Sequence, residues 1–129
     1  MQPSGLVGEI TPISASASIL TMTGEIDLAT VDLLSELFRT VVESGHNDVI
    51  VDMSAVTFID STGLHALVEG KQLLHDEGSR LFLVPSTQVR RVLELCFPEP
   101  LFATRVETVE IAIDMMSLPT AGSEIPIGD

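Results

Sequence analysis

Two hydrophobic periods alternate along the chain, and their order predicts a series of strands and helices. Residues 16–23 (SASILTMT) alternate with a period of two and include β-branched residues, which predicts a strand that ends at Gly24. Residues 9–14 are expected to pair with it as a hairpin, and Pro12 restricts them to an edge of the sheet. Residues 48–53 (DVIVDM) are nearly all apolar, which predicts a central strand covered on both faces.

The first helix is expected to begin after Asp27 or Thr30, either of which can act as its N-cap, and to run to about Ser44. Gly45 follows at the position where a left-handed C-cap is expected. Helical spacing gives this segment one buried stripe, which consists of Leu34, Leu37, Phe38, Val41 and Val42.

A second helix is expected after a short loop, starting at Asp60 to Thr62 and ending at Gly78. Its helically spaced apolar residues are Leu64, Leu67, Val68 and Leu74, with Lys71 on the same line. Residues 81–84 (LFLV) follow, and their apolar run predicts another buried strand.

The last third of the chain predicts a third helix, a short strand and a fourth helix. The third helix opens at Pro85 and Ser86 and is stopped by Pro98. Its inner side is expected to carry Val89, Val92, Leu93 and Cys96. A short strand is expected near residues 104–106 and a helix over residues 107–116.

This alternation of strands and helices predicts one α/β domain in which right-handed crossovers join parallel strands. A chain of 129 residues suits a single domain. We expect a flexible N-terminus over residues 1–8, the domain over residues 9–116 and a flexible tail over residues 117–129. Functional residues of such sheets gather at the carboxyl ends of strands, and residues 52–62 lie at one of these ends.

The charge of the chain excludes several classes of partner. Six basic residues face nineteen acidic ones, which gives a formal net charge of −13. Because a nucleic-acid backbone or an anionic membrane would repel this surface, we expect neither as a partner. The charge favours solubility and steering toward a basic partner.

Other features of the sequence indicate a cytoplasmic protein. One cysteine, Cys96, allows no internal disulfide, which fits a reducing compartment, and its place on an apolar stripe predicts a core residue. We expect no membrane span, because no apolar stretch of about 18 residues occurs. The first residues do not resemble a signal peptide.

An acid, two hydroxyls and a glycine stand together where the second helix should begin. Asp60 or Ser61 can simply cap that helix, because their oxygens accept from the free amides of its first turn. The same amides carry about half a positive charge and favour an anion. A phosphoryl group on Ser61 would therefore be tolerated by the domain, whereas an apolar partner docked over it would be displaced. The cluster has the properties of a binding switch.

The sequence resembles the STAS domains of the bacterial anti-sigma factor antagonist family. Three segments carry the resemblance, which spans roughly residues 10–116, and FIDSTGL within the second segment is the most specific part. The segments are TGEIDLAT (23–30), VIVDMSAVTFIDSTGLHAL (49–67) and LFLVPSTQVRRVLELC (81–96). The resemblance implies a small mixed sheet of four to five strands packed against four helices.

The resemblance also implies a regulatory function without a cofactor and without enzymatic activity. The unmodified protein would bind an anti-sigma factor that is also a serine kinase of the histidine-kinase-like ATPase fold, which frees the sigma factor. The kinase would phosphorylate Ser61 and so release the protein, and a serine phosphatase would reset it. Thr62 is the less favoured phosphoacceptor. The partner-binding residues would be Asp27, Asp60, Thr62, Gly63 and Leu64, with Gly63 leaving the hydroxyl accessible to the kinase.

Alternatives remain open for this chain. It can be a STAS interaction module of a stress-signalling complex that is never phosphorylated. An aspartyl-phosphate receiver domain would use Asp52 at a strand end, but Lys71 is the sole lysine and lies in a predicted helix rather than after a late strand. A serine hydrolase would lack the G-x-S-x-G elbow around Ser61.

The histidines add little to these alternatives. His46, His65 and His75 are each expected to be exposed helix residues, although His65 lies one turn from Ser61. Three scattered histidines and one cysteine match no zinc spacing, so no metal site is expected.

Overall fold

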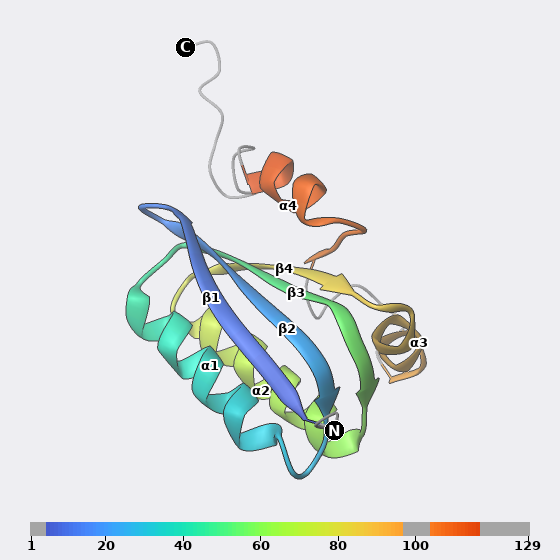
Figure 1. Cartoon of the computed structure of the whole chain (residues 1–129). Helices are drawn as coiled ribbons and strands as arrows, with labels where there is room; N and C mark the ends of the chain where they lie inside the picture. The colour runs from blue at the N-terminus through green and yellow to red at the C-terminus, as the bar shows by residue number, and fades with distance from the viewer. Residues whose placement is uncertain (1–4, 97–103, 117–129) are drawn as a thin grey trace, which may run out of the picture.

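The computed structural model describes residues 5–96 and 104–116 of the chain. Predictions that concern Pro98 and the C-terminal tail lie outside these residues. Five strands and four helices are described (Figure 1), in the order β1 (Leu6–Ser14), β2 (Ala17–Ile26), α1 (Val31–Ser44), β3 (Asp48–Ile59), α2 (Ser61–Asp76), β4 (Arg80–Pro85), α3 (Thr87–Cys96), β5 (Thr104–Arg105) and α4 (Val109–Met116).

The strands form one mixed sheet in the order β1-β2-β3-β4-β5. β1 is antiparallel to β2, as the predicted hairpin requires, and the other neighbours are parallel. β1 lies at the edge, which confirms the inference from Pro12, and it begins at Leu6, three residues earlier than predicted. The predicted mixed α/β architecture is confirmed.

The prediction that Gly24 ends the second strand is wrong, because β2 continues to Ile26. Gly24 has a φ of +120°, and a Cβ there would lie 2.0 Å from the carbonyl oxygen of Gly5. The register between β2 and β3 shifts directly after Gly24. This glycine therefore marks an irregularity inside a strand, where only a residue without a side chain lets the two backbones approach.

β3 is also longer than the predicted strand at residues 48–53, because it continues through the expected loop to Ile59. Its pairing with β4 stops at Met53, whereas its pairing with β2 continues to the Ile26–Ile59 pair. The last part of β3 is irregular, with Ser54 and Ala55 both exposed, so the alternation that predicts a strand is lost there. β2 and β3 consequently end side by side.

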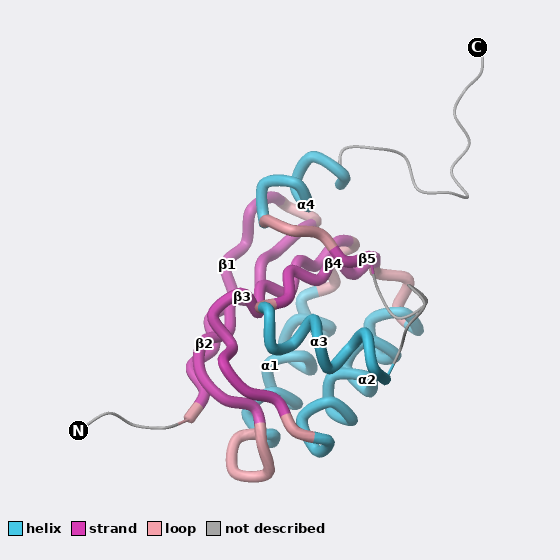
Figure 2. The backbone as a smooth tube through the Cα atoms, turned by 90° about the vertical axis from the view of Figure 1, so that its right-hand side faces the viewer, coloured by secondary structure: helices cyan, strands magenta, loops and turns pink. Residues whose placement is uncertain are grey.

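Helices cover both faces of the sheet, but unequally (Figures 1 and 2). α1, α2 and α3 pack on one face over a large core, and α4 packs on the other face over a small one. β3 contributes to both, as predicted for a strand covered on two sides: Val49 and Val51 belong to the large core and Ile50 to the small one. The small core also contains Phe82, Val84, Val106 and Ala112.

The predicted helix stripes are confirmed in most positions. In α1, Leu34, Phe38 and Val41 are buried while Leu37 and Val42 pack partly against the core, and Gly45 caps the helix at a φ of +75°. The expected stripe of α2 has Leu67 and Leu74 buried, with Leu64 and Val68 partly buried.

The prediction for α3 fails at its last residue. Val89 and Leu93 are buried and Val92 is partly buried, as expected. Cys96 is exposed, so its assignment to the core is wrong. It is the final residue of the helix, one turn beyond the positions that reach the core.

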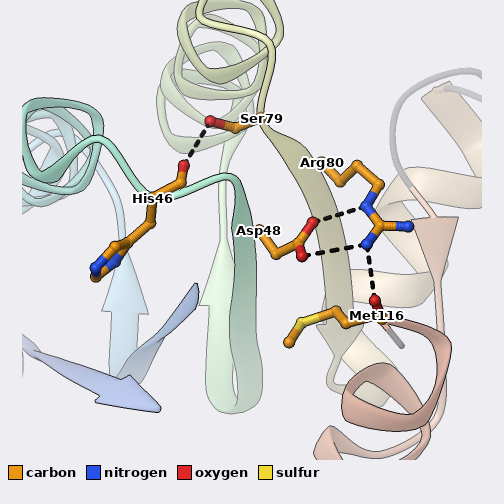
Figure 3. A network of polar contacts seen from close by, with 5 residues as sticks. All are labelled: His46, Asp48, Ser79, Arg80 and Met116. Atoms are coloured by element: carbon orange, nitrogen blue, oxygen red, sulfur yellow. Dashed lines mark hydrogen bonds and ion pairs between the residues drawn. The ribbon is translucent and has the colours of Figure 1, made fainter. Parts of the chain in front are cut away.

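Arg80 joins the end of α4 to two strands of the sheet (Figure 3). Arg80 begins β4 and Asp48 begins the neighbouring β3; the Arg80 Nε donates to Asp48 Oδ1 at 2.7 Å, and a second guanidinium nitrogen donates to Oδ2 at 3.1 Å. That same nitrogen donates to the carbonyl oxygen of Met116, the last residue of α4, at 2.9 Å. Arg80 therefore satisfies a carbonyl at the end of α4 that the helix itself leaves without a donor.

Candidate functional site

The site is built on the first turn of α2, which follows directly after β3. Asp60 is the N-cap of this helix, with extended backbone angles (φ −105°, ψ −174°). Its Oδ1 accepts a hydrogen bond from the Gly63 amide at 2.9 Å, and its carbonyl oxygen accepts from the Leu64 amide at 2.8 Å. Asp60 thus performs the capping function that the sequence allowed to either Asp60 or Ser61.

Ser61 is consequently not needed as a cap. It is the first residue of α2 and its side chain is exposed. The amides of Ser61 and Thr62 belong to the first turn, where the helix provides no acceptor of its own. The hydroxyl of Ser61 therefore stands in solvent at the end of the helix that carries partial positive charge.

The second predicted element of the site is the loop after β2. Asp27 Oδ1 accepts from the Ala29 amide at 3.0 Å. The Thr30 hydroxyl accepts from the Asp27 amide at 3.0 Å and donates to the Glu25 carbonyl oxygen at 2.8 Å. Thr30 occupies the N-cap position of α1, but its hydroxyl makes these loop contacts instead of a capping bond. The loop is thereby fixed by its own side chains.

The ends of β2 and β3 bring the two elements together. Ile26 and Ile59 are paired across the parallel strands, and the Asp60 amide donates to the Ile26 carbonyl oxygen at 3.2 Å. Asp27 directly follows Ile26 and Asp60 directly follows Ile59, so both aspartates lie at the same end of the two parallel strands. Figure 1 shows both connections at its lower edge. Asp27 and the Asp60–Leu64 segment, predicted as one partner-binding surface, are neighbours in space.

Gly63 has a packing role that the sequence did not indicate. It is buried, and a Cβ there would lie 2.5 Å from Ile26 Cγ2 and 2.8 Å from the Ile26 carbonyl oxygen. An added side chain would point into the domain, so the expectation that it would stand between the hydroxyl and a kinase is wrong. Thr62 and Leu64 are half-buried, and Leu64 packs against the large core.

Two exposed apolar residues at this edge were not predicted. Leu28 lies in the loop after β2 with 76% of its surface exposed, and Phe58 lies near the end of β3 with 47% exposed. Leu28 follows Asp27 in a segment without helical or strand period, so the sequence alone gave no sign of its exposure. Phe58 stands in the stretch of β3 that was predicted as a loop.

The structure does not support the hydrolase alternative. His65 Nε2 lies 3.1 Å from Glu69 Oε2, one turn further along α2 and away from Ser61. His46 is not an exposed helix residue as predicted, because it is half-buried in the connection between α1 and β3. Its Nδ1 is buried without a hydrogen-bond partner in the described part of the chain.

The receiver-domain alternative is contradicted by the topology. Receiver domains have parallel strands in the order 2-1-3-4-5, whereas this sheet has the order 1-2-3-4-5 with an antiparallel β1. Asp52 lies within β3 and not at its end, and its Oδ1 accepts from the amide and the hydroxyl of Ser54.

Among residues 5–96 and 104–116, no group of histidine, cysteine, aspartate and glutamate side chains is arranged to hold a metal ion. In the same residues, no helix has the length and apolarity needed to cross a membrane.

Comparison with known proteins identifies the family. The sequence matches the STAS domain family over residues 10–115. It is 30% identical to the anti-sigma-B factor antagonist of Staphylococcus aureus strain NCTC 8325 over 73 residues, which are 56% of this chain and 68% of that protein. The chain belongs to the STAS-domain family of anti-sigma factor antagonists, as its resemblance to that family implied.

Solved structures of the same class share the fold. An anti-sigma factor antagonist from Mycobacterium paratuberculosis superposes with a TM-score of 0.78 at 23% identity, over 88% of this chain and 96% of that one. The anti-sigma factor antagonist SpoIIAA in its unphosphorylated form gives 0.70 at 20% identity, over 85% and 96%. SpoIIAA of Bacillus in its phosphorylated form gives 0.66 at 21% identity, over 85% and 99%.

Proposed function

We propose that this chain binds an anti-sigma factor while Ser61 is unmodified and is released when Ser61 is phosphorylated. The partner is an anti-sigma factor that is also a serine kinase of the histidine-kinase-like ATPase fold. Binding frees the sigma factor for transcription, and a serine phosphatase restores the unmodified protein. The cytoplasm is the compartment in which we expect this cycle to operate.

One observation carries the proposal: Ser61 is exposed at the N-terminus of α2, beside the loop that contains Asp27. A kinase can reach this hydroxyl, because Asp60 rather than Ser61 supplies the cap. In the reaction, Ser61 Oγ bonds to the γ-phosphorus of ATP, ADP leaves, and the hydroxyl proton passes to a base of the kinase.

The position of Ser61 also suits the addition of charge. A phosphoserine carries about −1.5 to −2 charge at neutral pH, and the first turn of a helix stabilises anions by about 0.3–1 kcal/mol. The domain is therefore expected to keep its fold while its docking surface changes. The fold that this chain shares with both the unphosphorylated and the phosphorylated forms of SpoIIAA supports this expectation.

The remaining residues of the predicted surface have separate functions in this proposal. Asp27 and Asp60 contribute carboxylates that backbone amides already hold in place. Thr62 and Leu64 flank the hydroxyl on the first turn of α2, and Gly63 lets that turn lie close to Ile26. Together they fix the geometry in which a partner meets Ser61.

To test the proposal, the purified chain is used to capture its partner from an extract of the native cell, in the presence and in the absence of ATP. Mass spectrometry then identifies the captured proteins and the phosphorylated residue. We expect an anti-sigma factor in the ATP-free sample, with ATP causing its release and the modification of Ser61. Ser61→Ala is expected to retain the partner in ATP, and Ser61→Asp to bind it weakly. Thr40→Ala, which removes an exposed hydroxyl on α1 outside the proposed surface, is the control and is expected to behave as wild type.

The outcomes separate this function from its alternative. If an anti-sigma factor is retained in ATP and no residue is modified, the chain is a STAS module that operates without phosphorylation. If both Ser61 variants bind like wild type and remain fully phosphorylatable, the assignment of Ser61 is wrong.

A further inference from the structure

Exposed apolar side chains lie at the same end of the strands as Ser61, and the described part of the chain does not bury them. We propose that Leu28 and Phe58 are the apolar anchors of the docking surface, and that the partner meets them with an apolar patch. This inference rests on the proposed function, because the occupant is the anti-sigma factor that binds at Ser61.

Leu28 is held outward by a loop that cannot easily rearrange. Hydrogen bonds from the Ala29 amide to Asp27 and from the Thr30 hydroxyl to the Glu25 carbonyl oxygen fix the backbone on both sides of it. Leu28 itself is 76% exposed. A rigid loop that presents a leucine to solvent loses little conformational entropy when a partner buries that side chain.

Phe58 lies near the end of β3, where none of the described helices buries it. Ile59 belongs to the large core, whereas the preceding Phe58 does not and is 47% exposed. Among the described residues, α4 packs where Ile50 and Phe82 lie, nearer to the start of β3 than to its end (Figures 1 and 2). Phe58 is therefore available to a partner that also contacts the end of β3.

The two side chains belong to one continuous surface. Phe58 is paired with Glu25 across β2 and β3, and Glu25 accepts the hydrogen bond from Thr30 that fixes the loop of Leu28. Ser61 follows Phe58 by three residues. Leu28, Phe58 and Ser61 therefore all lie where β2 and β3 end, so a partner seated over Ser61 is expected to reach both apolar side chains.

The charges at this edge indicate what the partner presents. The segments 23–31 and 55–64 contain Glu25, Asp27 and Asp60 but neither lysine nor arginine. A basic partner group directly opposite Ser61 would form a charge-assisted pair with a phosphate and would strengthen binding instead of ending it. The partner surface is therefore expected to have no basic group directly over Ser61 and to carry any basic groups at its rim.

The test measures the affinity of the captured partner for Leu28→Ala, Phe58→Ala and the double variant. Each single variant is expected to weaken binding about tenfold, because truncating a central apolar anchor costs more than 1 kcal/mol. Leu73→Ala and Ile13→Ala are the controls, at 40% and 37% exposure, and are expected to stay within about twofold of wild type. Leu73 lies twelve residues beyond Ser61, or about 18 Å along α2.

Thermal unfolding checks that each variant is folded. The binding test is repeated with Leu28→Ser, because serine suits an exposed loop, and with Phe58→Thr, because threonine suits a strand. If Ser61→Asp weakens binding while the Leu28 and Phe58 variants bind like wild type, the anchors are refuted and the proposed function stands. If the wild-type chain binds no anti-sigma factor, the proposed function itself fails.

Discussion

At the scale of single residues, neighbouring positions at the start of α2 have different structural functions. Asp60 caps α2, Ser61 is left exposed, and Gly63 allows the first turn to approach β2. The sequence predicted the capping chemistry and the exposed hydroxyl, because both follow from residue types at a helix start. It did not predict the function of Gly63, because the neighbour that requires a glycine is Ile26, which is 37 positions away in the chain.

The capping function of Asp60 can be separated from its charge. Asp60→Ala is expected to lower the free energy of unfolding by about 1 kcal/mol, because the Gly63 amide loses its acceptor. Asp60→Asn retains a side-chain oxygen for the cap and is expected to stay closer to wild type. Chemical denaturation measures both. Equal losses in the two variants would contradict a capping function and indicate that the charge is required.

The close contact at Gly63 makes a second residue-level prediction. Gly63→Ala is expected to destabilise the domain by about 1–3 kcal/mol, because the new methyl group meets Ile26 and forces α2 away from the sheet. Ser61→Ala, two residues earlier at an exposed position, is the control and is expected to change stability by less than about 0.5 kcal/mol. Urea denaturation measures both variants. A Gly63→Ala variant as stable as wild type would show that the helix shifts at no cost.

At the scale of elements, helix positions were predictable and strand lengths were not. Apolar stripes predicted α1 and α2 well, because a helical spacing that repeats over about three turns can still be recognised when one position does not fit it. β2 continues past its predicted end at Gly24, and β3 continues past its predicted end near Ser54. At both places the register shifts and the alternation of buried and exposed residues fails, so the sequence pattern does not predict that the strand goes on. The site depends on these extensions, since they carry the strands to the Ile26–Ile59 pair that aligns the two loops.

The attachment of α4 gives a prediction for an element. Arg80→Met removes the ion pair with Asp48 and the donor to the Met116 carbonyl oxygen, so it is expected to cost about 1–3 kcal/mol. Hydrogen exchange is expected to accelerate in α4 and to change little in α2. Arg39→Met, on the exposed side of α1, is the control. Uniform acceleration in all helices would mean that the ion pair stabilises the whole domain and not α4 in particular.

At the scale of the whole molecule, negative charge is spread over the chain, whereas the proposed switch is a single residue. The formal charge of −13 already exceeds the charge that one phosphate adds. Composition argued against nucleic acid as a partner, but it could not locate the proposed binding surface. That surface follows from the topology, which places two loops distant in sequence at one edge of the sheet.

Adding charge at Ser61 is accordingly expected to leave the fold intact. Ser61→Asp is expected to change the free energy of unfolding by less than about 1 kcal/mol, with the sign favouring stabilisation, because the helix N-terminus attracts an anion. Thermal unfolding at low and at high salt measures the effect, which should diminish as salt screens it. A loss of several kcal/mol would mean that modification acts by unfolding the domain.

The two ends of the described chain lie at opposite edges of the sheet. Gly5 accepts a hydrogen bond from the Glu25 amide, beside the end of β2, whereas Met116 is held by Arg80 at the start of β4. An affinity tag or a fluorophore placed ahead of Gly5 would therefore crowd the surface on which Leu28 and Ser61 are presented. Immobilisation through the C-terminal side leaves that surface open, so this is the orientation in which partner capture should be performed.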